Sequence, residues 1–165
     1  MTTLKLAVLD GDGIGPEVTE EALKVLDVLA HETDFSFEYE RADFGGAAID
    51  SSGNPFPDSC ERLVNASDAV LLGAVGGPKW DDLTGNQRPE RGLLNLRGSL
   101  GVYANLRPAR FFDSLCSASP LRADLTADVD FVTVRELIGG IYFGEPRGIT
   151  QTAEGRVGQN TMVYS

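Results

Sequence analysis

Hydrophobic residues in the first seventy positions alternate between the spacing of strands and the spacing of helices. The apolar run 4–9 predicts a strand, and apolar positions three or four residues apart over 16–29 predict a helix after a glycine loop. Alternation of apolar and polar residues over 35–41 predicts a half-exposed strand. A short helix is predicted over 58–65, and the apolar run 69–72 predicts a buried parallel strand. Strands that alternate with helices in this way predict an α/β fold with an open parallel sheet and right-handed crossovers.

The second half of the chain has shorter and less regular elements. Leucines at helical spacing predict a helix over 93–100, and the run 102–106 predicts an extended segment that ends before Pro108. Residues 129–134 predict a further strand, and the polar tail predicts a hairpin about Gly155. Such a hairpin needs a partner, such as a second copy of the chain, because two strands alone are marginally stable. Turns or loops are predicted at 45–46, 50–57 and 111–120 and over the long Gly- and Pro-rich stretch 73–92, whose length is typical of a functional loop.

The glycine loop after the first strand is a candidate nucleotide-binding motif. Its sequence, GDGIGPE, places glycines at Gly11, Gly13 and Gly15, followed by Pro16. A dinucleotide-binding fingerprint has the spacing G-x-G-x-x-G, with a pyrophosphate at the positive end of the helix. Here the spacing is G-x-G-x-G, and acidic residues crowd the first turns of the helix. The loop therefore does not predict a Rossmann-type site.

Composition and charge exclude several classes of function. The 165 residues are enough for one ordinary domain, and 42% of them are hydrophobic. The formal charge of −11, from 25 acidic against 14 basic residues, argues against nucleic acid as a partner. No run approaches the length of a membrane span, and the first residues lead into a strand without a signal sequence, so we expect a cytoplasmic protein. The isolated Cys60 and Cys116 predict reduced thiols and no metal site.

Two arginines stand out in this acidic chain because each closes a predicted element. Arg97 lies near the end of the helix 93–100, and Arg107 follows the extended run 102–106. A guanidinium group is planar and permanently charged, so a pair of them suits a small polycarboxylate. The alternative is that both are surface arginines whose apolar stems lie on hydrophobic neighbours. These residues alone support the two interpretations equally.

Four motifs in order along the chain resemble the isocitrate/isopropylmalate dehydrogenase family of β-decarboxylating dehydrogenases. They are GDGIGPEV, LLGAVGGPKWD, RPERGLLNLRGSLGVYANLRPAR and VRELIGGIYFGEPRG, and together they run the length of the sequence. The segment RPERGLL is closer to the isopropylmalate members than to the isocitrate members. The resemblance implies NAD-dependent oxidative decarboxylation of (2R,3S)-3-isopropylmalate to 2-oxoisocaproate in leucine biosynthesis.

The resemblance also implies how the chain is organised. The family has two intertwined open α/β domains, of which this sequence covers about the N-terminal half. Residues 1–100 would form part of the first domain, and 101–165 the start of the second, with an arm that forms a homodimer. The ligands of Mg²⁺ or Mn²⁺, a catalytic lysine and the stretch that binds the adenosine end of NAD are expected outside these residues. The chain by itself is therefore expected to be inactive.

The motif positions assign roles to individual residues. Tyr142 would act in proton transfer, together with the lysine that is expected elsewhere. Arg97, Arg107 and Arg135 would bind the carboxylates of a 2-hydroxy dicarboxylate. Glu90, Leu93 and Leu94 would lie near the substrate and the nicotinamide, and the residues that border the dinucleotide would be Ile14, Gly76, Gly77, Pro78, Lys79, Trp80, Asp81, Pro89 and Glu90.

Two other classes of function stay open on the sequence. A sister enzyme of the same family would act on tartrate, malate or homoisocitrate instead. A non-catalytic module would bind a small dicarboxylate or a protein partner through an exposed sheet. The chain also departs from the family pattern at Gly98 and Ile138, where Lys and Thr are usual.

Overall fold

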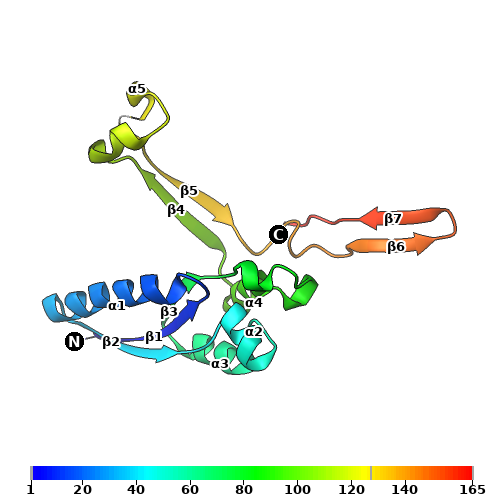
Figure 1. Ribbon diagram of the computed structural model, residues 1–165, viewed down its shortest axis with the longest axis horizontal. Coiled ribbons are helices and arrows are strands. Elements are labelled where there is room, and N and C mark those ends of the chain that lie inside the picture. The colour runs from blue at the N-terminus through cyan, green and yellow to red at the C-terminus, as the bar shows by residue number, and fades with distance from the viewer. Residues whose placement is uncertain (1, 127, 165) are drawn as a thin grey trace. The chain divides into compact units, whose positions relative to one another are not determined.

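The structure is a computed structural model that describes residues 2–126 and 128–164 (Figure 1). The chain divides into two compact units, Met1–Leu100 and Gly101–Ser165. None of the helices in the described residues is both long and apolar enough to cross a membrane. The elements of the first unit are β1 (Thr2–Gly11), α1 (Gly15–Glu32), β2 (Phe35–Arg41), α2 (Gly46–Ser52), α3 (Asp58–Ala66), β3 (Ala69–Ala74), the 3₁₀ helices η1 (Pro78–Trp80) and η2 (Gly85–Gln87), and α4 (Pro89–Leu100).

β1 is the central strand of a parallel sheet with the order β2-β1-β3. Leu6 lies opposite Tyr39 of β2 on one side and Ala69 of β3 on the other. Val8 and Leu9 have no exposed surface, so the strand forms the middle of the unit. The predicted α/β fold with parallel pairing is confirmed, and each predicted strand of this unit is present.

The two faces of β1 pack against different helices, because side chains along a strand alternate between faces. Figure 1 shows α1 on one side of the sheet and α3 on the other. The main core lies on the α3 side. There the rings of Phe44 and Phe56 pack edge to face, with their centroids 5.9 Å apart. The cluster comprises Ala7, Leu9, Phe44, Phe56, Cys60, Val64 and Leu96.

Cys60 is a structural thiol within this core. Burial, with a smaller contribution from the charge of Asp43, raises its pKa to about 11. Because the thiolate is the reactive form, Cys60 stays protonated and inert near neutral pH. This fits the predicted reduced thiol, while the side chain of Cys116 lies outside the part of the chain that the structure describes.

Gly15 lies where α1 begins and packs against the backbone of two strands. A Cβ atom at this position would overlap the carbonyl oxygen of Asp10 in β1 and lie 3.0 Å from the backbone nitrogen of Ala74 in β3. A Cβ atom at Gly73 of β3 would also overlap the carbonyl oxygen of Asp10. These glycines therefore allow α1 to approach the sheet closely.

Several elements differ from those that the sequence predicts. The predicted loop 73–92 contains η1 and η2, and α4 begins at Pro89, four residues before the predicted helix 93–100. The segments 45–46 and 50–57 are predicted as turns, but α2 occupies 46–52 and ends at Gly53 in the left-handed conformation, with φ of 77°. The extended segment predicted over 102–106 is displaced, since the strand β4 (Ala104–Arg110) begins two residues later and runs past Pro108. In the described residues β4 pairs with β5 (Asp130–Glu136) alone, and an edge strand tolerates a residue that lacks an N–H donor.

The second unit contains an antiparallel ribbon of β4 and β5. Arg107 lies opposite Thr133, and Asn105 lies opposite Arg135. The loop predicted at 111–120 contains a 3₁₀ helix that the sequence did not predict. The elements of this unit are β4 (Ala104–Arg110), η3 (Asp113–Ala118), α5 (Ala123–Thr126), β5 (Asp130–Glu136), β6 (Gly148–Thr152) and β7 (Gly155–Gln159).

β6 and β7 form the hairpin that the sequence predicts about Gly155. Thr150 lies opposite Val157 in this antiparallel pair. β7 ends at Gln159, however, and Val163 instead makes an isolated antiparallel bridge with Gly140. The end of the chain near Val163 thus pairs with the segment before β6, at Gly140, and does not lengthen the hairpin.

Candidate functional site

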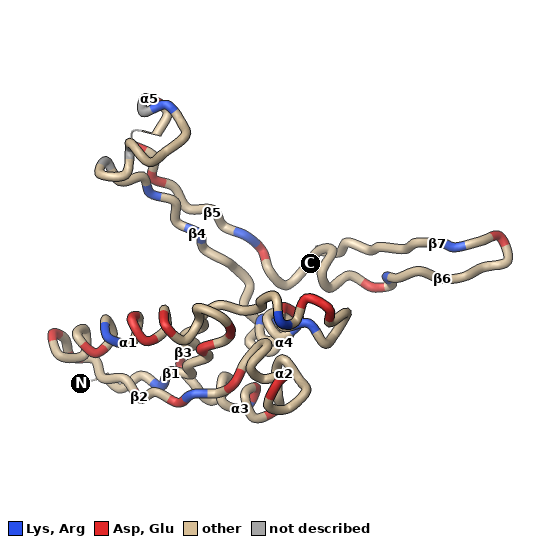
Figure 2. Tube along the Cα trace, viewed as in Figure 1, with Lys and Arg blue, Asp and Glu red and all other residues tan. Residues whose placement is uncertain are grey.

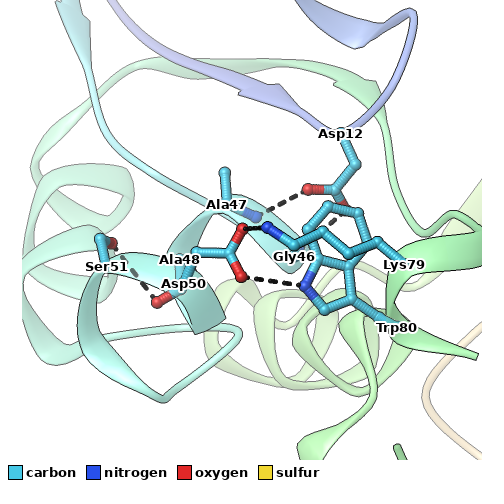
Figure 3. A network of polar contacts seen from close by, with 8 residues as sticks. All are labelled: Asp12, Gly46, Ala47, Ala48, Asp50, Ser51, Lys79 and Trp80. Carbon is cyan, nitrogen blue, oxygen red and sulfur yellow. Dashed lines mark hydrogen bonds and ion pairs between the residues drawn. The ribbon is translucent and has the colours of Figure 1, made fainter. Parts of the chain in front are cut away.

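A buried carboxylate, Asp12, ties together three segments at the carboxyl ends of the strands of the first unit. Figure 3 shows it beside Gly46 and Ala47. Only 3% of its surface is exposed. Its Oδ2 accepts the N–H groups of Gly46 at 2.8 Å and Gly76 at 2.7 Å, and its Oδ1 accepts that of Ala47 at 2.8 Å. These charge-assisted bonds fix the glycine loop, the start of α2 and the loop after β3 relative to one another.

A second carboxylate, Asp50 on α2, holds the loop Gly76–Asp81 from another side (Figure 3). Lys79 Nζ donates to Asp50 Oδ2 at 2.5 Å, and Trp80 Nε1 donates to Oδ1 at 3.3 Å. The hydrogen bond from Lys79 lowers the pKa of the Asp50 carboxyl. The Trp80 ring lies so close to Gly46 that a Cβ atom there would overlap it. The six predicted cofactor-binding residues from position 76 to 81 therefore form one fixed loop.

α4 begins beside this loop. Pro89 is fully buried, and a Cβ atom at Gly76 would lie 2.8 Å from Glu90 Oε1, so the Glu90 carboxyl lies against the loop backbone. Gly92 packs on the carbonyl oxygen of Pro55, which a Cβ atom would approach to 2.7 Å. These contacts seat the first turn of α4. Further along the helix the predicted residues Leu93, Leu94 and Arg97 are half-buried.

Arg107 and Arg135 lie on the same face of the β4–β5 ribbon. Residues directly opposite each other in two paired strands share a face, and so do residues two positions apart along one strand. The side chains on this face therefore include Arg107 and Asn105 of β4 and their partners Thr133 and Arg135 of β5. Diagonal neighbours in such a pair are roughly 7–8 Å apart. Arg107 Nε donates to Asn105 Oδ1 at 2.6 Å, which orients that guanidinium group. Two guanidinium groups at this spacing can bind one small dicarboxylate.

Tyr142 lies beside the second of these arginines. The Cζ atom of Arg135 is 5.8 Å from the centroid of the Tyr142 ring, and half of the tyrosine is exposed. Arg147 holds the tyrosine backbone, since its guanidinium donates to the Tyr142 carbonyl oxygen at 3.0 Å. Arg147 Nε also lies 3.4 Å from Glu145 Oε1. The result is an accessible phenol beside a cation on a fixed segment.

The turn between β5 and Tyr142 is closed by Glu136. Its Oε1 accepts the N–H groups of Ile138 and Gly139, both at 2.6 Å. Ile138 contributes its backbone to this turn, which a threonine would do equally. Gly98, the other departure from the family pattern, is exposed on α4, and a Cβ atom there would meet no atom within 4 Å. Neither departure disturbs the local structure.

The predicted residues fall into two groups, one in each unit. Glu90 lies against the loop 76–81 in the first unit, and Arg107, Arg135 and Tyr142 lie together in the second. Arg97 belongs to the first unit, and its convergence with the other arginines stays a prediction. So do the contacts of Ile14, which is 56% exposed in the glycine loop.

Sequence reasoning missed the residues that hold these groups in place. Asp12 had a signal, because it stands between Gly11 and Gly13, both in left-handed backbone with φ of 73° and 58°. A short acidic residue in such a loop is well placed to accept backbone N–H groups. The other supporting residues, Asp50, Asn105 and Arg147, had no signal in the sequence.

Charge is distributed unevenly within the units. Figure 2 shows acidic residues along α1 and basic residues on β4, whereas β5 carries residues of both signs. At the end of β2, Arg41 neutralises part of the acidic surface by donating to Asp10 at 2.9 Å and to Glu20 at 2.5 Å. Within residues 2–126 and 128–164, no group of three His, Cys, Asp or Glu side chains is arranged to hold a metal ion.

Known proteins are similar to the whole chain. Residues 5–165 match the family described as isocitrate/isopropylmalate dehydrogenase. A 3-isopropylmalate dehydrogenase from Sulfurimonas denitrificans is 54% identical over 100% of this chain and 45% of that protein. Another from Geobacillus kaustophilus is 57% identical over 99% of this chain and 44% of that protein. The chain thus spans less than half the length of these relatives.

Solved structures share the fold over less than half of their length. An isocitrate dehydrogenase from Methylococcus capsulatus gives a TM-score of 0.72 at 27% identity, covering 100% of this chain and 43% of that one. The apo form of a β-decarboxylating dehydrogenase from Thermococcus kodakarensis gives a TM-score of 0.63 at 31% identity. This match covers 97% of this chain and 41% of that one.

Proposed function

Since this chain belongs to the isocitrate/isopropylmalate dehydrogenase family, we propose that it carries carboxylate-binding and proton-transfer residues of a leucine-biosynthesis enzyme. The reaction is the NAD-dependent oxidative decarboxylation of (2R,3S)-3-isopropylmalate to 2-oxoisocaproate. The observation that carries the proposal is the group of Arg107, Arg135 and Tyr142. Two cations beside a phenol suit a dianionic 2-hydroxy acid. The choice of substrate is supported by the 54% and 57% identical relatives, both of which are 3-isopropylmalate dehydrogenases.

Arginines bind the substrate in this proposal. Arg107 and Arg135 each grip a carboxylate through two parallel hydrogen bonds, and Arg97 is a third arginine that we assign to the same dianion. Leu93 and Leu94, half-buried on α4, offer an apolar contact for the isopropyl group. We thus assign recognition of the substrate's charge to the arginines and recognition of its branched hydrocarbon to these leucines.

Tyr142 transfers a proton in this proposal. Its phenol can donate a proton to the carbon from which carbon dioxide has left, because the ring is accessible and is held beside Arg135. When bound, NAD supplies the hydride acceptor and Mg²⁺ or Mn²⁺ supplies a Lewis acid. No cluster of three His, Cys, Asp or Glu side chains suited to the ion occurs in the described residues.

The fixed loop 76–81 borders the dinucleotide in this proposal, together with Ile14, Pro89 and Glu90. A loop that is already held by hydrogen bonds suits this role because less conformational entropy is lost when a ligand binds to it. Glu90 lies against Gly76 at the start of this loop, and we assign its carboxyl to the nicotinamide end of the dinucleotide. The exposed side chain of Ile14 offers an apolar surface to the adenine side.

The enzyme acts as a homodimer in this proposal, with the β6–β7 hairpin as its arm. Ile149 is 65% exposed on this hairpin and Val157 is 51% exposed. A two-stranded hairpin in water is marginal, and pairing with a second copy would stabilise it. The net charge of −11 supports the absence of a nucleic-acid partner. A cytoplasmic location and the absence of a membrane partner complete the proposal.

A chimera tests the proposed function. Residues 1–165 would replace the matching 45% of the Sulfurimonas denitrificans relative. With 3-isopropylmalate, NAD and Mg²⁺ or Mn²⁺, we expect NADH formation with a kcat/KM of at least about 10⁴ M⁻¹ s⁻¹, the lower end of the usual range for enzymes. The 165-residue chain alone is the control, and it should show no turnover.

The same assay separates the alternatives. Tartrate, malate and homoisocitrate would be offered to the chimera in turn, and a higher kcat/KM on any of them would replace 3-isopropylmalate as the substrate. Binding of a dicarboxylate without turnover of any acid would support a non-catalytic module instead.

Arg107→Lys in the chimera should lower kcat/KM for 3-isopropylmalate by at least about tenfold. Lysine keeps the charge but loses the planar fork, and a charge-assisted hydrogen bond is worth roughly 1.5–3 kcal/mol, where about 1.4 kcal/mol is tenfold. The matched control is Arg110→Lys, since Arg110 lies on the opposite face of β4, 4.0 Å from Asp130. Steady-state kinetics that show a raised KM for NAD with unchanged kcat/KM for the acid would remove Arg107 from the substrate site.

A further inference from the structure

We propose that Asp12 is a positioning residue for the cofactor, because its carboxylate sets the geometry of the loop Gly76–Asp81 and so the affinity for NAD. The inference rests on the proposed function, which assigns that loop to the dinucleotide. Asp12 acts without touching NAD, since it is 3% exposed and backbone amides bind both of its oxygens.

The backbone of Asp12 is itself fixed to the sheet. Its N–H donates to the carbonyl oxygen of Ala74 at the end of β3, at 2.7 Å. Its carbonyl oxygen accepts the N–H of Gly15 at 2.8 Å, at the first residue of α1. The carboxylate therefore projects from a point that the central strand, its neighbour and α1 all define.

The carboxylate positions the loop at two places. Directly, Oδ2 binds the N–H of Gly76, where the loop begins. Indirectly, the same oxygen binds the N–H of Gly46, and Gly46 is the surface against which the Trp80 ring packs. Trp80 then donates to Asp50 on the same helix, α2 (Figure 3). The Asp12 carboxylate thus positions both the beginning of the loop, at Gly76, and its far part, at Trp80.

The site requires a group that only accepts hydrogen bonds. Three N–H donors converge on Asp12, from Gly46, Ala47 and Gly76. An asparagine would keep the shape but turn an NH₂ donor toward at least one of these amides. A buried N–H that loses its acceptor carries the full desolvation penalty, so the loop or the start of α2 would move to relieve it.

Asp12→Asn in the chimera tests the inference. We expect KM for NAD to rise about tenfold, the effect of one lost charge-assisted hydrogen bond, while kcat and KM for 3-isopropylmalate stay within about twofold. A structural readout accompanies the kinetics. With fluorotryptophan incorporated, the ¹⁹F resonance of Trp80, assigned by its loss in Trp80→Phe, should shift in Asp12→Asn.

Asp68→Asn is the matched control. Asp68 Oδ2 also accepts a backbone N–H, that of Lys5 at 2.8 Å, but at the opposite end of β1 and away from the loop. This variant should leave both the Trp80 resonance and KM for NAD unchanged. An equal rise in KM for NAD would show a general loss of stability and overturn the inference.

Gly46→Ala is the second variant, for use if Asp12→Asn does not fold. It keeps the carboxylate but places a Cβ atom into the Trp80 ring, so it displaces the loop independently. It should shift the ¹⁹F resonance and raise KM for NAD.

The outcomes separate the two proposals. An active wild-type chimera whose folded variants keep the wild-type KM for NAD would overturn the role of Asp12 and leave the proposed function intact. An inactive wild-type chimera would overturn both.

Discussion

Replacing Tyr142 with phenylalanine in the chimera should lower kcat for 3-isopropylmalate by roughly 10²–10⁴, the usual contribution of one general acid or base. Phenylalanine keeps the ring that faces Arg135 and removes only the hydroxyl. The carbonyl oxygen of residue 142 would still accept the hydrogen bond from Arg147, so the segment should keep its position. KM for each substrate should change by less than about threefold, because the hydroxyl acts after binding.

Tyr103→Phe is the matched control for this substitution. Tyr103 lies in the same unit, and its carbonyl oxygen, which any residue would provide, accepts the N–H of Leu137 at 2.8 Å. Its loss of a hydroxyl should leave kcat unchanged. If Tyr142→Phe kept more than about a third of the wild-type kcat, the proton would have to come from another group.

Gly15→Ala should lower the free energy of unfolding by about 3 kcal/mol, the upper end of the range for overpacked sites. The added Cβ atom would overlap the carbonyl oxygen of Asp10 and lie 3.0 Å from the nitrogen of Ala74. Both are backbone atoms of paired strands, so neither can move without disturbing the sheet. The measurement is the shift of the urea midpoint at unchanged m value, followed by circular dichroism.

Gly13→Ala is the control two residues earlier in the same loop. A Cβ atom at Gly13 would have no neighbour within 4 Å, but its φ of 58° is left-handed. We expect a loss of about 1–2 kcal/mol from the backbone conformation alone. If Gly13→Ala lowered the free energy of unfolding more than Gly15→Ala did, close packing of α1 on the sheet would not explain why position 15 is a glycine.

The sequence predicts the sheet of the first unit well because burial imposes a period that the residues must follow. The apolar run in β1 and the spacing in α1 are examples, since both are determined by a local pattern. α2 has no such local signal. It has seven residues and no side-chain cap of its own, and its first amides are satisfied by Asp12, 34 positions earlier in the chain. A helix whose first N–H groups depend on a distant carboxylate cannot be predicted from its own sequence alone.

The candidate site shows the same division. Arg107 and Arg135 are both recognisable by motif, but their position on one face depends on the register between β4 and β5. A shift of one residue in that register would put them on opposite faces, and no local feature of either strand determines it. The neighbour of Tyr142 is likewise decided by how the segment after β5 turns, which Glu136 controls through backbone N–H groups.

Dependence on one carboxylate has a consequence for how this region can change in evolution or by design. Gly46, Ala47 and Gly76 share a single acceptor, so substitutions at these positions should combine non-additively, as expected for residues in one hydrogen-bond network. The exposed residue Pro78 lies outside that shared constraint, whereas Lys79 is held by its ion pair with Asp50. If the loop borders the dinucleotide as proposed, cofactor preference can therefore be redesigned at Pro78, while a change at one of the three anchored positions should require compensation at the others.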